Sequence, residues 1–306
     1  MTPDDPPSNS LDTATAVYAE HRELLFSLVY NLLGTVADTE DVLQETWLSW
    51  AFARHAQIAN ARAYLVRIAV NEALSRLRQA RRARESYVGP WLPEPVVTET
   101  GPEITERQER TESVSLALMV VLETLTPLER AVFVLREAFG YDHTEIAAIL
   151  GRTPAAVRQL SHRARDHVQA RRPRFEPDPA VRRAATERFV AAALGGDLNT
   201  LMEVLAPDVT LWTDGGGKLR AALHAVEGRE KVVRLIAATA GGRPQDLTIR
   251  LLDVNGGPAA LMFAGDTVYG VVVCDLTPED RIRAIYSVIN PDKLTGVTAR
   301  PGLDGR

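Results

Sequence analysis

The sequence contains two arginine-rich segments that could bind a negatively charged partner. Residues 60–84 contain seven Arg and one Glu, and residues 152–174 contain seven Arg and one Asp, so each segment has a net charge of +6. The rest of the chain carries −17, because the total is −5. Guanidinium groups bind phosphates well, and two basic stripes in an acidic background indicate two contacts with nucleic acid. Two ordinary solvated helix faces are the alternative, although such faces usually mix both signs of charge.

The sequence shows no pattern of side chains typical of catalysis. The six histidines lack the spacing of metal ligands, and Cys274 lies in an apolar run without a neighbouring base, so we expect no metal, cofactor or thiol chemistry. The segment DGGGK at 214–218 lacks the G-x-x-x-x-G-K-[ST] spacing of a phosphate-binding loop, and its glycines instead favour close approach of two backbone segments. Four acids at predicted strand ends or turns are expected to be solvated: Asp214, Asp253, Asp266 and Asp275.

Length and composition are typical of a multidomain protein from a reducing compartment. The 306 residues, 45% of them hydrophobic, are enough for about two domains with sizeable cores. The single Cys274 cannot form an intramolecular disulfide, no secretion signal opens the sequence, and no apolar run approaches the roughly 18 residues of a membrane span. We therefore expect a cytoplasmic protein that makes no membrane contact.

The first arginine run belongs to a predicted helical block. Apolar residues recur at helix spacing from Leu24 to Leu32, a second helix starts at Asp38, and a third starts near Asn60 and carries the arginines toward its end. Residues 89–103 contain four prolines and break every period, which predicts a linker.

The second arginine run belongs to a predicted helix-turn-helix at 144–168. Asp142 and Glu145 form a capping box, Gly151 ends the first helix, and Thr153 caps the second after a short turn. A DNA-reading helix needs polar residues on its outer face, although an ordinary helical hairpin is the alternative. The outer face of this second helix holds Arg158, Gln159, His162, Arg163 and Arg165.

The pattern changes to mixed helices and strands after residue 178. Helices are expected at 180–194, at 198–205 and near 227–240, and Asn255-Gly256-Gly257 predicts a hairpin. Strand-like runs occupy 209–213, 247–254, 258–264, 267–275 and 281–288. This order predicts an α+β cone, a curved antiparallel sheet with helices packed on it, after two all-α domains.

Three segments resemble the conserved regions of a bacterial sigma factor of the extracytoplasmic-function (ECF) group. DTEDVLQETWLSW at 38–50 resembles the part of region 2 that docks on the clamp of core RNA polymerase. YLVRIAVNEALSRLRQARR at 64–82 resembles the segment that melts and reads the minus-ten promoter element, and residues 125–168 resemble region 4, which reads the minus-thirty-five element. The third region of larger sigma factors is absent, as in the ECF group.

Three short motifs resemble the signatures of one ECF subgroup, the sigma-J type with a fused SnoaL-like C-terminal extension. They are WLPEP at 91–95, DGGGK at 214–218 and NPDKL at 290–294. The resemblance implies a multidomain arrangement with these bounds: a disordered tail at 1–11, a region 2 helical domain at 12–88, a proline-rich linker at 89–112, a region 4 helix-turn-helix domain at 113–172, a SnoaL-like regulatory domain at 178–296 and a flexible tail at 297–306.

The implied function is initiation of transcription by a protein that is not an enzyme. It would recruit core RNA polymerase to promoter DNA and be regulated in cis by the C-terminal domain through an intramolecular contact with the linker. The alternative is an enzyme of the cyclase or isomerase kind fused to a DNA-binding module, because the C-terminal fold resembles those enzymes. The sequence also leaves open whether the cone binds an unidentified small ligand.

The resemblance also assigns site residues. Polymerase docking is assigned to Asp38, Glu40, Asp41, Gln44 and Glu45. The alternative is that some of them only complement the helix N-terminus, and Asp38 fits this alternative best. Minus-ten DNA would be bound by Arg54, Asn60, Tyr64, Arg67, Asn71, Arg76, Arg78, Arg81 and Arg82. Tyr64 could equally be a core residue, and Trp47 and Trp50 are expected in the core.

Minus-thirty-five DNA would be bound by Arg152, Thr153, Arg158, Gln159, His162, Arg163 and Arg165. The regulatory contact would join Trp91, Leu92, Pro93, Glu94 and Pro95 to Asp214, Gly215, Gly216, Gly217, Lys218, Asn290, Pro291, Asp292 and Lys293. Within it we expect Lys218 to pair with Glu94, and the mouth of the cone to accept Trp91.

Overall fold

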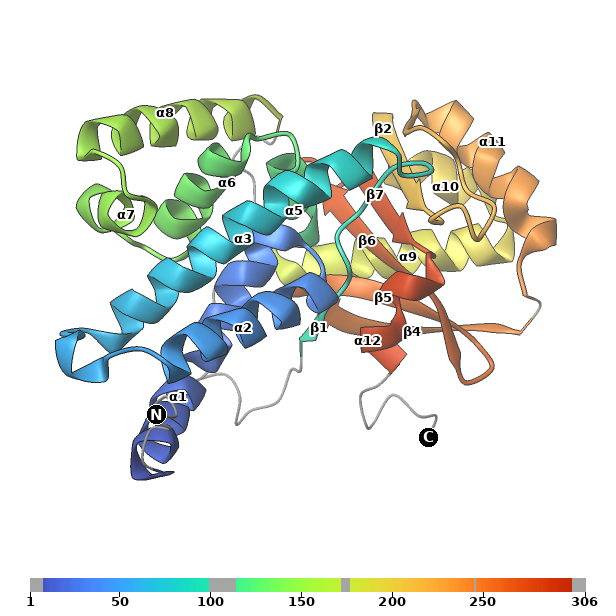
Figure 1. Cartoon of the computed structure of the whole chain (residues 1–306). Helices are drawn as coiled ribbons and strands as arrows, with labels where there is room; N and C mark the ends of the chain where they lie inside the picture. Colours follow the sequence, from blue (N-terminus) through green and yellow to red (C-terminus); the bar gives the residue numbers. More distant parts are fainter. Residues whose placement is uncertain (1–7, 99–113, 172–176, 245, 299–306) are drawn as a thin grey trace. The chain divides into compact units, whose positions relative to one another are not determined.

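A computed structural model describes residues 8–98, 114–171, 177–244 and 246–298 (Figure 1). Contacts divide these residues into two compact units. The helical unit contains residues 8–82 and 122–170, and the sheet unit contains 83–98, 114–121, 171 and the described residues from 177 onward. Both sigma-like regions therefore belong to one unit, and the described part of the linker belongs with the sheet.

The helical unit is built from long amphipathic helices and the expected helix-turn-helix (Figure 1). Its elements are α1 (Ser8–Leu33), α2 (Val36–Ala51), η1 (His55–Gln57), α3 (Ala61–Glu85, whose last three residues belong to the sheet unit), α6 (Pro127–Phe133), the π-helical turn η2 (Val134–Ala138), α7 (His143–Leu150) and α8 (Pro154–Arg171, whose last residue belongs to the sheet unit). Helix α1 begins inside the segment expected as a disordered tail, so residues 8–11 are helical; residues 1–7 lie outside the described residues. Leu25 and Leu28 of α1 and Leu65 of α3 are fully buried, as the helical periodicity predicts.

The helix-turn-helix forms for the reasons visible in the sequence. The Asp142 side chain accepts hydrogen bonds from the backbone N–H groups of Thr144 and Glu145, and the Glu145 carboxylate accepts one from the Asp142 N–H. Gly151, at φ 61°, ends α7 in a left-handed conformation that a glycine adopts without strain. The inner face of α8 is then buried through Val157, Ser161, Ala164 and Val168.

The sheet unit contains one seven-stranded sheet in the order β1-β4-β5-β6-β7-β2-β3. Its elements are β1 (Val97–Thr98), α5 (Leu116–Leu122, whose last residue belongs to the helical unit), α9 (Pro179–Gly195), α10 (Leu198–Val204), β2 (Leu205–Asp214), β3 (Val226–Glu227), α11 (Arg229–Thr239), η3 (Ala240–Gly242), β4 (Leu247–Val254), β5 (Gly257–Ala264), β6 (Thr267–Leu276), β7 (Ile282–Val288), η4 (Pro291–Lys293) and α12 (Thr295–Thr298). Strands β4 to β7 form the expected meander. The sheet is mixed rather than purely antiparallel, because β2 enters beside β7 in the same direction.

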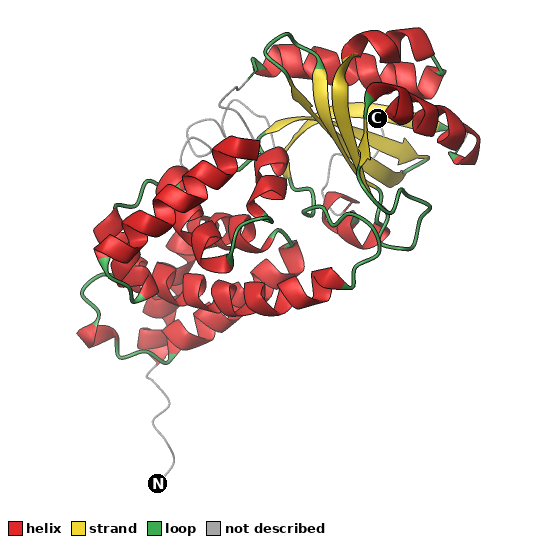
Figure 2. Ribbon diagram, turned by 90° about the horizontal axis from the view of Figure 1, so that it is seen from above, coloured by secondary structure: helices red, strands yellow, loops and turns green. Residues whose placement is uncertain are grey.

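Each face of the sheet is covered by a different part of the chain. Figure 2 shows helices lying over one face of the sheet, and the core there joins Phe189, Leu201 and Ile236 to strand residues. On the other face Leu92 and Leu116 pack with strand residues and with Val297. Val297 is fully buried, so the C-terminal tail begins later than expected; residues 299–306 lie outside the described residues.

Across the described ranges, no helix is long and apolar enough to cross a membrane.

Candidate nucleic-acid and polymerase interface

Helix α2 presents the predicted polymerase-docking residues within two turns. They are Asp38, Glu40, Asp41, Gln44 and Glu45, of which the last three are exposed and the first two half-buried. Asp38 stands in the first turn of α2 and accepts a 2.5 Å hydrogen bond from the Thr35 hydroxyl, so it also complements the helix N-terminus. Glu40 pairs with Arg22 of α1 at 2.7 Å.

Arg76 was predicted to bind DNA phosphates, but it contacts the carboxylates of α2 instead. Its guanidinium faces α2 and pairs with Asp41 at 2.7 Å, Glu45 at 3.1 Å and Asp38 at 3.5 Å. Burial alone would lower the pKa of Arg76, but the hydrogen bonds and charges of Asp41 and Glu45 outweigh it and raise the pKa. Arg76 therefore belongs to the acidic face of α2 and not to the exposed arginine stripe.

The two tryptophans of α2 differ in burial. Trp50 is in the core, where its indole N–H donates to the carbonyl of Ala14 at 2.9 Å. Trp47 is half-buried against the ring of Tyr18, with ring centroids 5.3 Å apart. The core expectation is met fully by Trp50 and in part by Trp47.

The minus-ten candidates lie on η1, on the loop around it and along α3. Except for Arg76 and the half-buried Tyr64, all are exposed: Arg54, Asn60, Arg67, Asn71, Arg78, Arg81 and Arg82. Tyr64 packs beside Trp50, with ring centroids 5.9 Å apart, and Arg67 stacks over the Tyr64 ring. Tyr64 thus combines the core and surface positions that the sequence leaves open.

A cavity of about 700 Å³ adjoins this segment within the helical unit. It is lined by Arg54, Gln57, Ile58, Ala59, Asn60, Ala63, Tyr64 and Arg67 from region 2 and by Tyr141, Glu145, Ala148 and Ile149 from region 4. The Asn71 amide donates to the Ile149 carbonyl at 3.2 Å, and the Arg62 guanidinium lies 6.0 Å from the centre of the Tyr141 ring. Helix α7 therefore forms one wall of the cavity beside which four of the minus-ten candidates lie, namely Arg54, Asn60, Tyr64 and Arg67.

The outer face of α8 is exposed as predicted, except for the half-buried Arg165, and its residues differ in their contacts. Arg165 pairs with Glu137 at 2.7 Å, and His162 lies 2.6 Å from Asp166 one turn along. Arg158 is exposed and has no hydrogen bond or ion pair with the rest of the described chain. The remaining candidates are also exposed: Arg152, Thr153, Gln159 and Arg163. Arg158 is thus placed to reach a base edge without first breaking a contact.

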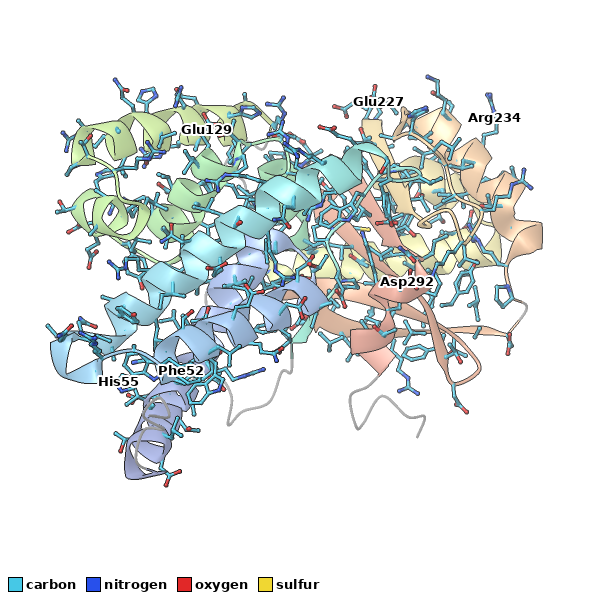
Figure 3. The ribbon with its side chains drawn as sticks, in the orientation of Figure 1. Phe52, His55, Glu129, Glu227, Arg234 and Asp292 are labelled. Carbon is cyan, nitrogen blue, oxygen red and sulfur yellow. The ribbon has the colours of Figure 1, made fainter. Side chains whose placement is uncertain are left out.

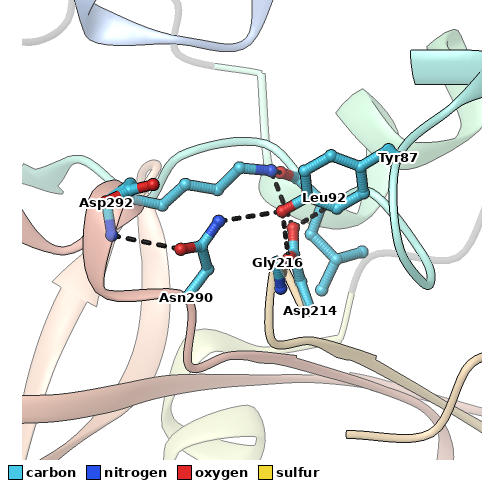
Figure 4. A network of polar contacts seen from close by, with 7 residues as sticks. Tyr87, Leu92, Asp214, Gly216, Asn290 and Asp292 are labelled. Atoms are coloured by element: carbon cyan, nitrogen blue, oxygen red, sulfur yellow. Dashed lines mark hydrogen bonds and ion pairs between the residues drawn. The ribbon is translucent and has the colours of Figure 1, made fainter. Parts of the chain in front are cut away.

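A buried polar network binds the linker to the strand and loop motifs of the sheet unit (Figure 4). Lys293 donates from Nζ to the Asp214 carboxylate at 2.7 Å and to the Leu92 carbonyl, and the Leu92 N–H donates to Asp214 Oδ2 at 2.9 Å. Asp214 is 0% and Lys293 7% exposed. One buried ion pair therefore provides hydrogen-bond partners for both the N–H and the C=O group of Leu92.

Tyr87 extends the same network to the end of α3. Its hydroxyl donates to Asp214 at 2.6 Å and accepts from the Asn290 amide at 2.8 Å. Burial, followed by the hydrogen bond to the Asp214 carboxylate, raises the pKa of Tyr87 well above its usual range, so the hydroxyl remains a donor. A Cβ on Gly216, at φ 59°, would lie 2.3 Å from the Asn290 amide nitrogen, which explains a glycine there.

One detail of the predicted linker contact is wrong. Lys218 pairs with Asp292 at 2.6 Å on the surface and not with Glu94, because the glycine turn directs it toward NPDKL. The Trp91 ring lies between two cations, with its centre 3.5 Å from Arg84 Cζ and 4.2 Å from Lys293 Nζ, and its place at the mouth of the cone stays a prediction.

Two further segments, β1 and α5, pack in the sheet unit and were not predicted from the sequence. Strand β1 pairs with β4 through Val97 and Val254, and the backbone N–H of Asn255 donates to the Val96 carbonyl at 2.8 Å. Leu116 of α5, 1% exposed, packs on the same face as Leu92. Only the β-branched pair after WLPEP hinted at a strand, and nothing local assigned α5 to the sheet.

The acids expected to be solvated divide into three environments. Asp214 is fully buried in the linker network, Asp275 is buried and paired with Arg283 at 2.7 Å, and Asp253 pairs with Arg183 at 2.6 Å. Asp266 alone of the four is exposed, in the turn between β5 and β6. The expectation holds for Asp266 and is wrong for the other three, because those strand ends meet partner residues instead of water.

The thiol of Cys274 is buried, and burial raises its pKa to about 12, which keeps it unreactive. The described residues include no group of three or more His, Cys, Asp or Glu side chains that could hold a metal ion.

Comparison with known proteins agrees with this geometry. Sigma-70 region 2 matches residues 17–83, and Sigma-70 region 4 matches residues 115–168. The chain is 39% identical to the ECF RNA polymerase sigma factor SigJ of Mycobacterium tuberculosis, over 90% of this chain and 91% of that one. It is 29% identical to the probable ECF RNA polymerase sigma factor SigI of the same species, over 95% of this chain and 98% of the relative.

The crystal structure of M. tuberculosis SigJ superimposes with a TM-score of 0.70 at 35% identity, covering 92% of this chain and 98% of that one. The chain therefore belongs to the ECF RNA polymerase sigma factors, and the expected fold of two sigma regions and a C-terminal α+β domain is confirmed. As a sigma factor it acts in transcription initiation with core RNA polymerase and promoter DNA, and it is not an enzyme.

Proposed function

We propose that this sigma factor is regulated in cis by its sheet unit, which holds both ends of the linker between the two sigma regions. The acidic face of α2 docks on core polymerase. The loop at 54–60 together with α3 binds the minus-ten element, and α8 reads the minus-thirty-five element. This activity belongs to the cytoplasm, where core polymerase works.

The observation that carries the proposal is the buried pair of Lys293 and Asp214 closed around Leu92. A buried ion pair that loses one partner leaves an uncompensated charge, at a cost of about 3–5 kcal/mol. Leaving the network would cost the linker these hydrogen bonds as well as the apolar burial of Leu92. The held linker is therefore a discrete state rather than one of many loose conformations.

The two captured segments lie at the junctions with the sigma regions. Tyr87 follows α3 directly, so the network fixes the end of region 2. Leu116 starts α5, the first helix of the region 4 match, so the sheet also fixes the beginning of region 4. Weakening or strengthening these contacts between the linker ends and the sheet shifts the fraction of molecules whose two sigma regions can bind polymerase and promoter together.

The described residues inside the cone form an apolar core, and the proposal needs no ligand there. Asp214, one of the four acids singled out in the sequence, is bound by the linker.

The first test compares two lysines from the same pair of motifs. Lys293→Met removes the buried ammonium, whereas Lys218→Met removes an exposed one paired with Asp292. Promoter-dependent run-off transcription with core polymerase is expected to change severalfold in Lys293→Met and to stay near the unmodified level in Lys218→Met. Equal transcription by both variants and the unmodified protein would remove the network from regulation.

The second test is a double-mutant cycle between Tyr87→Phe and Asp214→Asn, scored in unfolding free energy and in transcription. The two side chains share a 2.6 Å hydrogen bond, so a coupling above about 0.5 kcal/mol is expected. Additivity would mean that linker and sheet do not communicate, and the in-cis model would be abandoned.

A further inference from the structure

The exposed stripe of α2 continues past its carboxylates into two large apolar side chains. Asp41, Glu45, Leu48 and Phe52 follow one another at intervals of four, three and four residues, which places them on one side of the helix. Leu48 is 49% and Phe52 77% exposed. Figure 3 shows Phe52 at the end of α2, near His55.

Phe52 is the most exposed of the large apolar side chains in the described part of the chain. Its neighbour His55 is engaged elsewhere, with its ring 4.3 Å from that of Trp50 and its Nε2 2.8 Å from the Trp50 carbonyl. Apolar side chains rimmed by polar ones are typical of protein interaction sites, and aromatic anchors dominate the affinity of such sites.

The charge of α2 limits what can cover this stripe. Residues 36–51 contain four carboxylates and no Lys, Arg or His. Nucleic acid would bring phosphates against Asp41 and Glu45, which are 58% and 48% exposed. A basic protein surface with an apolar strip complements both halves of the stripe.

We propose that Leu48 and Phe52 are the apolar anchor of the polymerase-docking face, and that they insert into an apolar strip bordered by basic residues on core RNA polymerase. This inference rests on the docking role of α2 in the proposed function. The carboxylates steer and orient the encounter, while the two apolar side chains supply the contact that excludes water from it.

The experiment measures the dissociation constant of the full-length protein for core polymerase by anisotropy of a label on the sheet unit. Phe52→Ala is expected to weaken binding about tenfold, and Leu48→Ala to weaken it in the same direction. Leu198→Ala is the matched control, because Leu198 is 44% exposed on α10 and outside every proposed interface. All three variants are expected to melt like the unmodified protein, since the changed side chains are largely exposed.

A second pair of variants separates this inference from the docking role itself. If Asp41→Asn with Glu45→Gln weakens polymerase binding while Phe52→Ala and Leu48→Ala do not, the apolar anchor is overturned and α2 docking stands. If none of these variants weakens binding, both are overturned. A third outcome is that Phe52→Ala leaves polymerase binding unchanged but lowers the affinity of the holoenzyme, formed with saturating sigma factor, for fork DNA with a single-stranded minus-ten element. Phe52 would then stack on a base, and the apolar anchor would again be overturned.

Discussion

Arg76 and Arg78 are two residues apart on α3, yet they meet different partners. Arg76 is surrounded by the carboxylates of α2, whereas Arg78 is exposed. A helix turns by about 100° per residue, so two positions apart lie on nearly opposite sides. Only the second of these arginines is available to a phosphate.

The salt dependence of promoter binding by the holoenzyme distinguishes the two arginines. Arg78→Gln is expected to make the slope of log affinity against log salt shallower by about one unit, because one phosphate contact is lost. Arg76→Gln is expected to leave that slope unchanged and to weaken binding to core polymerase, because its three carboxylates lose their alignment. Equal changes of slope in the two variants would return Arg76 to the DNA-binding stripe.

At the scale of elements, β1 shows how a linker becomes part of a sheet. Asn255 occupies the β4–β5 turn at φ 51°, a left-handed conformation that Asn tolerates better than most residues. Its side chain accepts a 3.3 Å hydrogen bond from the Val96 N–H, next to the β1 pairing. One residue therefore forms the hairpin and also holds the incoming strand.

Asn255→Gly separates these two roles. Glycine keeps the left-handed turn but removes the amide that holds Val96, so amide hydrogen exchange is expected to speed up at 96–98 and to stay slow in β4 and β5. Asn255→Ala, which strains the turn as well, is expected to speed exchange in both places. Unchanged exchange at 96–98 in Asn255→Gly would show that the β1 pairing is maintained without the side chain.

Local sequence predicted the elements whose cause is local. The capping box of Asp142 and Glu145, the left-handed Gly151 and the Asn255-Gly256 hairpin all fix structure within a few residues, and each was found where the sequence indicated. The exposed face of α8 followed from helix periodicity alone.

The features that escaped prediction depend on contacts between distant segments. Whether Arg76 faces phosphate or carboxylate depends on how α3 packs on α2, and the pairing of β1 joins residues more than 150 positions apart. The motifs WLPEP, DGGGK and NPDKL indicated that the linker and the sheet meet. Their residue types could not show that Lys293, and not Lys218, would be the buried partner.

At the scale of the whole molecule, the two units share the work unequally. The candidate groups for polymerase and DNA lie on the helical unit, and the sheet unit contains the network that holds the linker. Helix α5 crosses this division, because its first residues pack on the sheet while Leu122 belongs to the helical unit. Deleting residues 177–306 would therefore uncover Leu116, so such a truncated protein would lose part of its core as well as the proposed regulator.

The capture of the linker within one chain has a consequence for gene dosage. A regulator on a separate chain must match its target in number, and its hold depends on both concentrations, but a tethered segment meets its site at a fixed effective concentration. The fraction of held molecules is then the same whether a cell makes few copies or many, and output rises in proportion to copy number without a threshold. The test measures reporter transcription at increasing expression levels of this protein. A linear response is expected, and it would mean that any stimulus must act on the equilibrium between held and released linker. A sigmoidal response would instead indicate a second, saturable regulator.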